Sequence, residues 1–112
     1  MPHPIRAQII RGGTSKGVYL KEADLPRDPA DRDRTILGIF GSPDKRQIDG
    51  LGGADPLTSK CCIIGPPPKN RPEAAGCDLS YTFAQVEIAE PHVDYHSLCG
   101  NLTSGVATFA IW

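Results

Sequence analysis

The sequence predicts an α+β domain in which short strands and turns outnumber helices. With 112 residues there is room for one small domain, and hydrophobic residues make up 39% of them, so a core can form. The 12 Gly and 11 Pro residues indicate many turns and short strands. Alternating and helical patterns of apolar residues both occur along the chain, which places strands and helices in the same domain.

The N-terminal part of the chain predicts two strands joined by a glycine turn. Residues 5–10 are mainly apolar, residues 11–17 read RGGTSKG, and residues 18–20 are apolar again. The outer glycines have P-loop spacing, but Val18 and Tyr19 stand where that motif requires Lys and Ser or Thr, so a P-loop is not expected. The remaining hydroxyls, cations and backbone N–H groups suit a carboxylate or another small anion. A hairpin turn with solvated side chains is the alternative.

A helix is predicted over residues 29–40. Asp28 followed by Pro29 is typical of an N-cap and a first-turn proline. Gly41 is placed to end the helix. The apolar side of this helix is formed by Ile36, Leu37, Ile39 and Phe40.

A glycine-rich loop over residues 47–60 leads directly into a predicted buried strand over residues 61–64. The loop is too rich in glycine for a helix and too irregular for a strand, whereas CCII at residues 61–64 is continuously apolar. Glycine lets a backbone turn sharply and approach a ligand closely, so this loop can present Thr58, Ser59 and Lys60 to an anion. A surface loop with a solvated lysine is the alternative.

The second half of the chain predicts a surface loop, a strand and a helix. Residues 66–76 are polar and rich in proline, and residues 79–84 alternate as a strand does. After Cys99 the residues are small and apolar, with polar Asn101 and Thr103 near the start, which indicates a helix entering the interior. A thiol at a helix N-terminus has a lowered pKa, and the same N-terminus can hold a carboxylate. A buried structural cysteine is the alternative.

Composition argues against several classes of function. The net charge is −1, from 12 basic and 13 acidic residues, and the aromatic fraction is 6%. Without a basic stripe, nucleic-acid binding has no electrostatic support. No apolar run reaches the length of a membrane helix, and the first residues resemble neither a signal nor a transit peptide. We therefore expect no membrane partner and a cytoplasmic location.

Neither disulfides nor a metal site are expected. Without a secretory signal the four cysteines, Cys61, Cys62, Cys77 and Cys99, are expected to be reduced. Cys61 and Cys62 are adjacent in a predicted strand, so they should face opposite ways. His92, His96 and Cys99 have suitable donor atoms and short spacings for zinc, but no fourth ligand stands nearby. Solvated or hydrogen-bonded histidines are the favoured interpretation.

Four motifs in order resemble the 2-methylaconitate cis–trans isomerase family, the PrpF-type proteins. They lie at residues 11–17, 47–60, 78–86 and 99–101, and so spread over nearly the whole chain. Relatives in this family include 4-oxalomesaconate tautomerases and methylitaconate and aconitate isomerases. The resemblance implies a diaminopimelate-epimerase-like fold, in which two lobes enclose a cleft and each lobe wraps a β-sheet around a central helix. It also implies activity with neither a metal nor an organic cofactor.

By this resemblance the protein is a cofactor-independent isomerase or tautomerase that shifts a proton in a small unsaturated di- or tricarboxylate. Lys60 and Cys99 fall on the positions of the acid–base pair. Ser97-Leu98 replaces the Gly-Asn that usually precedes this cysteine, a departure that would change the turn aiming the thiol. The positions that line the substrate site in the family correspond to Arg11, Gly12, Gly13, Thr14, Ser15, Lys16, Gly53, Asn101 and Ser104.

The resemblance further predicts that residues 1–112 are an incomplete N-terminal lobe, because family members are several times longer. Two assemblies are open, a homodimer and a pairing with a missing C-terminal half. Two other classes of function are open as well, a catalytically inactive remnant and a binding module for acidic metabolites. The motifs do not fix which acid is the substrate.

Overall fold

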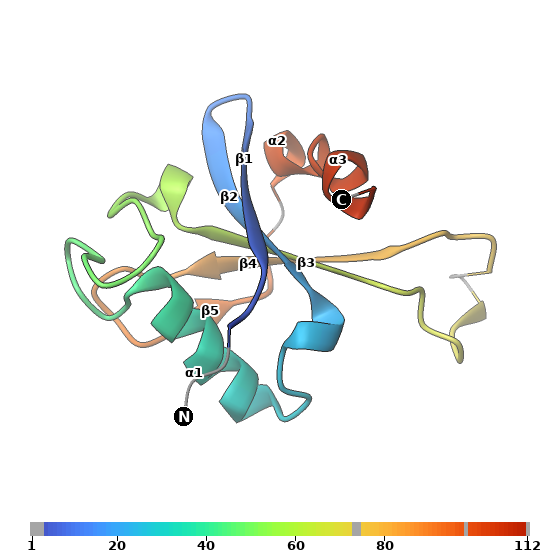
Figure 1. The fold of residues 1–112 in the computed structure, drawn as a ribbon, viewed down its shortest axis with the longest axis horizontal. Helices are drawn as coiled ribbons and strands as arrows, with labels where there is room; N and C mark the ends of the chain where they lie inside the picture. Colours follow the sequence, from blue (N-terminus) through green and yellow to red (C-terminus); the bar gives the residue numbers. More distant parts are fainter. Residues whose placement is uncertain (1–3, 73–74, 98, 112) are drawn as a thin grey trace.

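A five-stranded mixed β-sheet with helices against both faces organises the protein (Figure 1). The structure is a computed structural model that describes residues 4–72, 75–97 and 99–111. The strands are ordered β1-β2-β3-β4-β5 across the sheet. The predicted α+β class is confirmed.

Strands β2 and β3 are parallel, and the other neighbouring strands pair antiparallel. Each of the four strands predicted from the sequence is present with shifted bounds, and a short fifth strand follows them. The strands are β1 (Ala7–Gly12), β2 (Ser15–Lys21), β3 (Lys60–Gly65), β4 (Ser80–Val86) and β5 (Val93–Asp94).

Helix α1 (Pro29–Phe40) lies in the crossover that the parallel pair β2 and β3 requires. Its predicted caps are confirmed, since the Asp28 carboxylate accepts the Asp31 N–H at 3.1 Å. Gly41 ends the helix in the left-handed conformation, with φ 79°. Two short 3₁₀ helices, η1 (Glu22–Asp24) and η2 (Pro56–Thr58), lie near the two ends of the same crossover.

Two separate apolar cores cover the two faces of the sheet. The core under α1 contains Val18, Leu20, Ile36, Phe40, Cys61, Ile63, Ala84 and Val86. The core on the other face contains Tyr19, Cys62, Ile64, Phe83, Cys99, Leu102 and Phe109. Neighbouring strand residues therefore alternate between the cores, and the expected separation of Cys61 from Cys62 is confirmed.

The predicted C-terminal helix is two short helices, α2 (Gly100–Thr103) and α3 (Val106–Ala110). The interruption has a physical cause at the Leu102 carbonyl, which accepts both the Gly105 N–H at 3.1 Å and the buried Tyr19 hydroxyl. These bonds tighten the turn and end the regular helical pattern there. The Tyr19 ring also packs at a tilt against Phe109, with ring centroids 5.8 Å apart.

Gln47 organises the glycine-rich loop that precedes β3. Its amide nitrogen donates to the hydroxyls of Ser42 at 2.9 Å and Ser59 at 2.8 Å, and its amide oxygen accepts the Ala54 N–H at 2.8 Å. Only 1% of Gln47 is exposed. A Cβ on Gly52 would lie 2.2 Å from the Gln47 amide oxygen, so the glycine is needed for the loop to close around this side chain. The Ser59 hydroxyl donates to the Val86 carbonyl inside the fold and is not presented to a ligand.

We expect Gln47→Met to lower the free energy of unfolding by about 2–3 kcal/mol, because it removes three hydrogen bonds, one of them to the buried Ser59 hydroxyl. Methionine keeps the length of the side chain, and any cost of the positive φ of 47° is similar for both residues. Urea denaturation measures the change. Gln8→Met is the matched control, since the buried Gln8 amide oxygen makes no hydrogen bond among the described residues. Equal losses in the two variants would contradict the role of the Gln47 network.

Candidate functional site

The predicted site residues gather where α2 meets the β1–β2 hairpin and where β3 begins. Cys99 immediately precedes α2, and its thiol donates to the Ser15 hydroxyl at an Sγ–Oγ distance of 3.6 Å. Cys99 is 9% exposed and Ser15 is 2% exposed. The fold therefore brings together two predicted site residues from opposite ends of the chain, in a nearly closed environment.

The hairpin and α2 are in close backbone contact. A Cβ on Gly12 would lie 2.0 Å from the Asn101 carbonyl oxygen, and Gly13 adopts φ +55° directly beside the Asn101 amide. The Asn101 side chain donates to the Thr14 hydroxyl at 3.1 Å, and the Ser104 hydroxyl donates to the Asn101 carbonyl at 2.8 Å. The two glycines thus allow α2 to approach closely enough to place Cys99 against the hairpin.

Lys60 begins β3 on the same face of the sheet. Its ammonium nitrogen donates to the Gln85 amide oxygen at 3.0 Å and lies 5.2 Å from the centroid of the Phe83 ring. The side chain is half-buried. The Lys60 charge acts on the thiols of Cys99 and Cys62 and favours the thiolate of each.

The Cys99 thiol has a pKa below its ordinary value. Burial is the largest single influence and raises this pKa, but the other influences together outweigh it. These are the Ser15 hydroxyl, the backbone N–H groups of Leu102 and Asn101, and the charge of Lys60. The thiol makes no regular capping hydrogen bond to α2, so the N–H groups act on the thiolate as nearby dipoles.

The thiols of Cys61 and Cys62 in strand β3 have pKa values above the ordinary value of a cysteine. Burial raises the pKa of Cys62 to about 11, and burial likewise raises the pKa of the fully enclosed Cys61. Cys99 is therefore set apart from the buried cysteines of β3 by its position between the hairpin and α2. The lowered pKa favours the thiolate, which is the form of a cysteine that can accept a proton.

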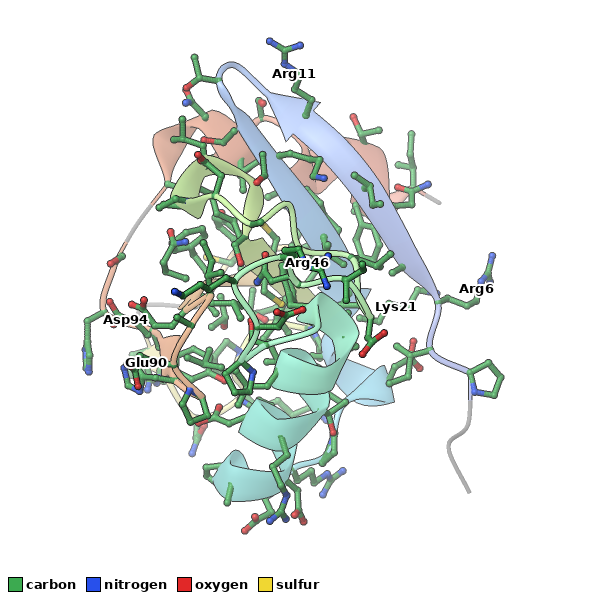
Figure 2. All side chains as sticks on the ribbon, turned by 90° about the vertical axis from the view of Figure 1, so that its left-hand side faces the viewer. Arg6, Arg11, Lys21, Arg46, Glu90 and Asp94 are labelled. Carbon is green, nitrogen blue, oxygen red and sulfur yellow. The ribbon has the colours of Figure 1, made fainter. Side chains whose placement is uncertain are left out.

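Three predicted residues are less closely connected to this cluster. Arg11 is exposed at the tip of the hairpin, points away from the molecule and donates through Nε to the Gly13 carbonyl at 3.0 Å (Figure 2). Lys16 is half-buried next to Ser15 on β2. Gly53 lies in the loop before Lys60, where its N–H donates to the Thr58 carbonyl at 3.2 Å.

Sequence reasoning assigned no role to Gln85 or Phe83, which both contact Lys60. The motif at residues 78–86 contains them, but their contact depends on the register that pairs Lys60 with Gln85 and Cys62 with Phe83. Nothing in the spacing of residues along the chain reports that register. The signal available was the alternation of β4, which places Phe83 and Gln85 on one face.

Among the residues that the structure describes, no group of three or more His, Cys, Asp or Glu side chains is arranged to hold a metal ion. His92 and His96 are exposed. Leu98, part of the predicted departure before Cys99, lies outside the described residues. No helix in the described ranges is long and apolar enough to cross a membrane.

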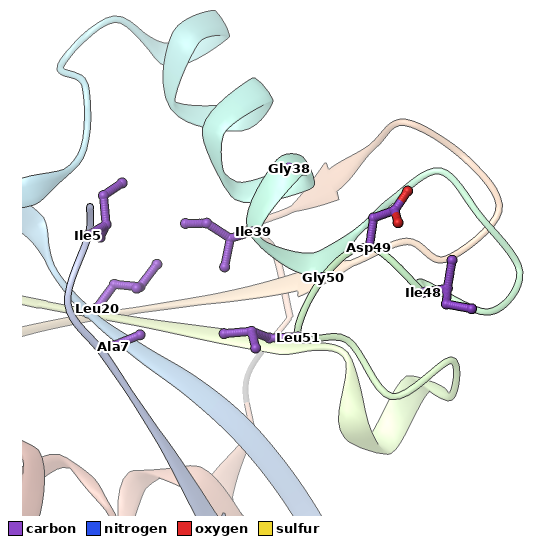
Figure 3. Close-up of a pocket in the computed structure, with 9 residues that line it drawn as sticks. All are labelled: Ile5, Ala7, Leu20, Gly38, Ile39, Ile48, Asp49, Gly50 and Leu51. Atoms are coloured by element: carbon purple, nitrogen blue, oxygen red, sulfur yellow. The ribbon is translucent and has the colours of Figure 1, made fainter. Parts of the chain in front are cut away.

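An open hollow of about 480 Å³ lies between β1, α1 and the loop at residues 48–51 (Figure 3). Its lining is mainly apolar and includes Leu20, Ile39 and Leu51, with Asp49 as its one ionisable side chain. Leu20 belongs to the core under α1, whereas Cys99 belongs to the core on the other face. The hollow is therefore separate from the cluster around Cys99 and carries none of its chemistry.

Comparison with known proteins places the chain in a known family. The family described as PrpF protein matches residues 3–112. The 3-methylitaconate isomerase of Eubacterium barkeri is 60% identical over 92% of this chain and 26% of its own length. The (4E)-oxalomesaconate Delta-isomerase of Novosphingobium sp. is 50% identical over 91% of this chain and 27% of its own. The 2-methyl-aconitate isomerase of Shewanella oneidensis is 46% identical over 96% of this chain and 27% of its own.

The fold is similar to that of a solved relative. The crystal structure of a methylitaconate-delta-isomerase superposes with a TM-score of 0.86 and 58% sequence identity, covering 96% of this chain and 26% of that one. The chain thus spans about a quarter of the length of the relatives it matches.

We expect Ser15→Ala to raise the pKa of Cys99 and to slow its alkylation by iodoacetamide at neutral pH by roughly twofold to tenfold, because a hydrogen bond that favours the thiolate is lost. Mass spectrometry of the Cys99 peptide across a pH series gives the midpoint. Ser80→Ala, on a half-buried serine of β4, is the matched control. An unmoved midpoint in Ser15→Ala would refute the contribution of this hydroxyl.

Gly12→Ala should destabilise the protein by at least about 2 kcal/mol, since the new Cβ would overlap the Asn101 carbonyl and force α2 away from the hairpin. Gly100→Ala is the control within the same site, because a Cβ there meets nothing within 4 Å. Thermal unfolding compares the two. If Gly12→Ala is as stable as Gly100→Ala, close backbone contact is not what places α2.

Proposed function

The chain belongs to the PrpF protein family, and on this premise we propose that it carries the acid–base centre of an isomerase acting on small unsaturated di- or tricarboxylates. The names of its relatives support the substrate class, because methylitaconate, oxalomesaconate and 2-methylaconitate are all unsaturated polycarboxylates. The same proposal takes residues 1–112 as an incomplete N-terminal lobe of a diaminopimelate-epimerase-like fold. The packing of α2 and α3 against one face of the sheet supports it.

The observation that carries the proposal is the placement of the Cys99 thiol against Ser15, near the Lys60 charge, with a lowered pKa. A thiolate is equipped to accept a proton, and an ammonium group is equipped to donate one. We assign these two roles to Cys99 and Lys60 respectively.

The reaction balances with these two groups alone. Cys99 removes a proton from a carbon next to the double bond, and the electron pair spreads over the allylic system and the adjoining carboxylate. Lys60 delivers a proton to the far carbon, so the double bond moves and the sum formula is unchanged. No electron is gained or lost, so the step requires no redox cofactor. Cationic groups and N–H groups stabilise the enolate-like charge.

Carboxylate binding is assigned to the hairpin and the start of α2. Arg11 and Lys16 are paired across the hairpin, and we assign to them the positive charge that attracts an anionic substrate to this end of the sheet. Thr14 and Asn101 are exposed and hydrogen-bonded to each other at 3.1 Å, which presents a polar surface next to the thiol. Such charged and polar donors are the usual partners of a carboxylate.

Incubation of the protein with methylitaconate in heavy water tests the proposal. Proton NMR should record deuterium entering the substrate, and Cys99→Ser should slow the exchange by roughly 100-fold or more, because a serine hydroxyl is a far weaker base than a thiolate. Cys77→Ser changes an exposed cysteine in the same way and should leave the rate unaltered.

Other outcomes separate the competing functions. Binding of methylitaconate without deuterium exchange would favour a binding module for acidic metabolites. Neither binding nor exchange would favour a catalytically inactive chain. Undiminished exchange in Cys99→Ser would refute the role of this thiol.

A further inference from the structure

Both polar atoms of the Gln85 side chain make hydrogen bonds at the edge of the candidate site. Its amide nitrogen donates to the carbonyl oxygens of Pro56 at 3.0 Å and Ser59 at 3.1 Å. Its amide oxygen accepts from the Lys60 ammonium nitrogen at 3.0 Å. The opposite orientation would turn the amide oxygen toward two carbonyl oxygens and the amide nitrogen toward a cation. The loop carbonyls therefore determine that an oxygen faces Lys60.

The register of the sheet places this acceptor directly beside the lysine. Lys60 and Gln85 are opposite each other in the antiparallel pair β3 and β4, so their side chains share one face of the sheet. Phe83 lies on the same face of β4 and places its ring 5.2 Å from the ammonium nitrogen. Lys60 thus has one hydrogen-bond acceptor on its cross-strand side and an aromatic ring near its charge, which together restrict an otherwise flexible side chain.

The partner of Lys60 is neutral. The ion pair between Arg34 and Asp31 lies on the exposed surface of α1, and no carboxylate in the described part of the chain pairs with Lys60. An amide orients an ammonium group without cancelling its charge, whereas a carboxylate in the same place would neutralise it. The uncancelled charge is available to the Cys99 thiolate and to an anionic substrate.

We propose that Gln85 is a positioning residue that acts through Lys60: its amide, oriented by the Pro56 and Ser59 carbonyls, holds the lysine charge where it acts on Cys99. The proposal rests on the assignment of Lys60 and Cys99 as the proton-transfer pair. It also links the loop at residues 56–59 to the chemistry, since the loop orients the amide that orients the lysine.

A double-mutant cycle on the alkylation of Cys99 by iodoacetamide tests this proposal without relying on turnover. Gln85→Met should raise the pH midpoint of alkylation and slow the reaction at neutral pH by roughly twofold to tenfold, because Lys60 loses its acceptor. In a Lys60→Met background the same change should have no further effect. Gln8→Met, on β1, is the matched control and should leave the midpoint unmoved.

The possible results test the role of Gln85 separately from the pairing of Lys60 with Cys99. A midpoint raised by Lys60→Met but unmoved by Gln85→Met would overturn the role of Gln85 alone. A midpoint unmoved by Lys60→Met would overturn the pairing of Lys60 with Cys99 and the Gln85 role together. Equal effects of Gln85→Met in both backgrounds would show that Gln85 acts through general structure, which also overturns the proposal.

If circular dichroism shows that Gln85→Met does not fold, the double-mutant cycle is carried out with Gln85→Asn instead. Asparagine keeps the amide but is one methylene shorter, so it cannot reach the two carbonyls and Lys60 together. It should shift the midpoint in the same direction as Gln85→Met, and only when Lys60 is present. A shift that persists in Lys60→Met would overturn the proposal.

Discussion

The central strands β2, β3 and β4 lie between two cores, so each of their buried apolar side chains is committed to one core or the other by its position in the strand. Cys61 packs under α1 and Cys62 packs under α2 and α3. Because the strand period is two, a slip of one residue in β3 would move Lys60 to the face that α1 covers. The register of the central strands therefore decides whether Lys60, Gln85 and Ser15 can meet Cys99 on the same face.

Besides the strand register, the contacts of Cys99 require that α2 lies close to the β1–β2 hairpin. The register brings Ser15 to the correct face, but its hydroxyl reaches the thiol only because α2 lies against Gly12 and Gly13. The electrostatic environment of Cys99 depends on this contact as well, since Ser15 is the largest of the influences that favour the thiolate. The pKa of Cys99 therefore depends on the close backbone contact that Gly12 and Gly13 allow.

Local patterns in the sequence predict the helices and strands, but they do not predict which residues of different elements contact one another. The caps of α1 and the separation of Cys61 from Cys62 depend on neighbouring residues, and both are confirmed. The glycines of the loop at residues 47–60 are compatible with a ligand loop and with close internal packing. In the structure Gly52 makes room for the Gln47 amide, which donates to Ser42 before the loop and to Ser59 near its end. The break between α2 and α3 likewise depends on Tyr19, which is 83 residues from Leu102 in sequence.

Lys60 has a neutral hydrogen-bond partner, and this neutrality is consistent with the role that we propose for its charge. A carboxylate would hold the lysine more strongly, but it would also cancel the contribution of the Lys60 charge to the lowered pKa of Cys99. An amide orients the ammonium group and adds no net charge, provided that other contacts determine which way the amide faces. The carbonyls of Pro56 and Ser59 meet that condition, and they lie in the loop that Gln47 holds through Ser59. The buried network around Gln47 and the charge of Lys60 are therefore connected through Ser59, whose hydroxyl accepts from Gln47 and whose carbonyl accepts from Gln85.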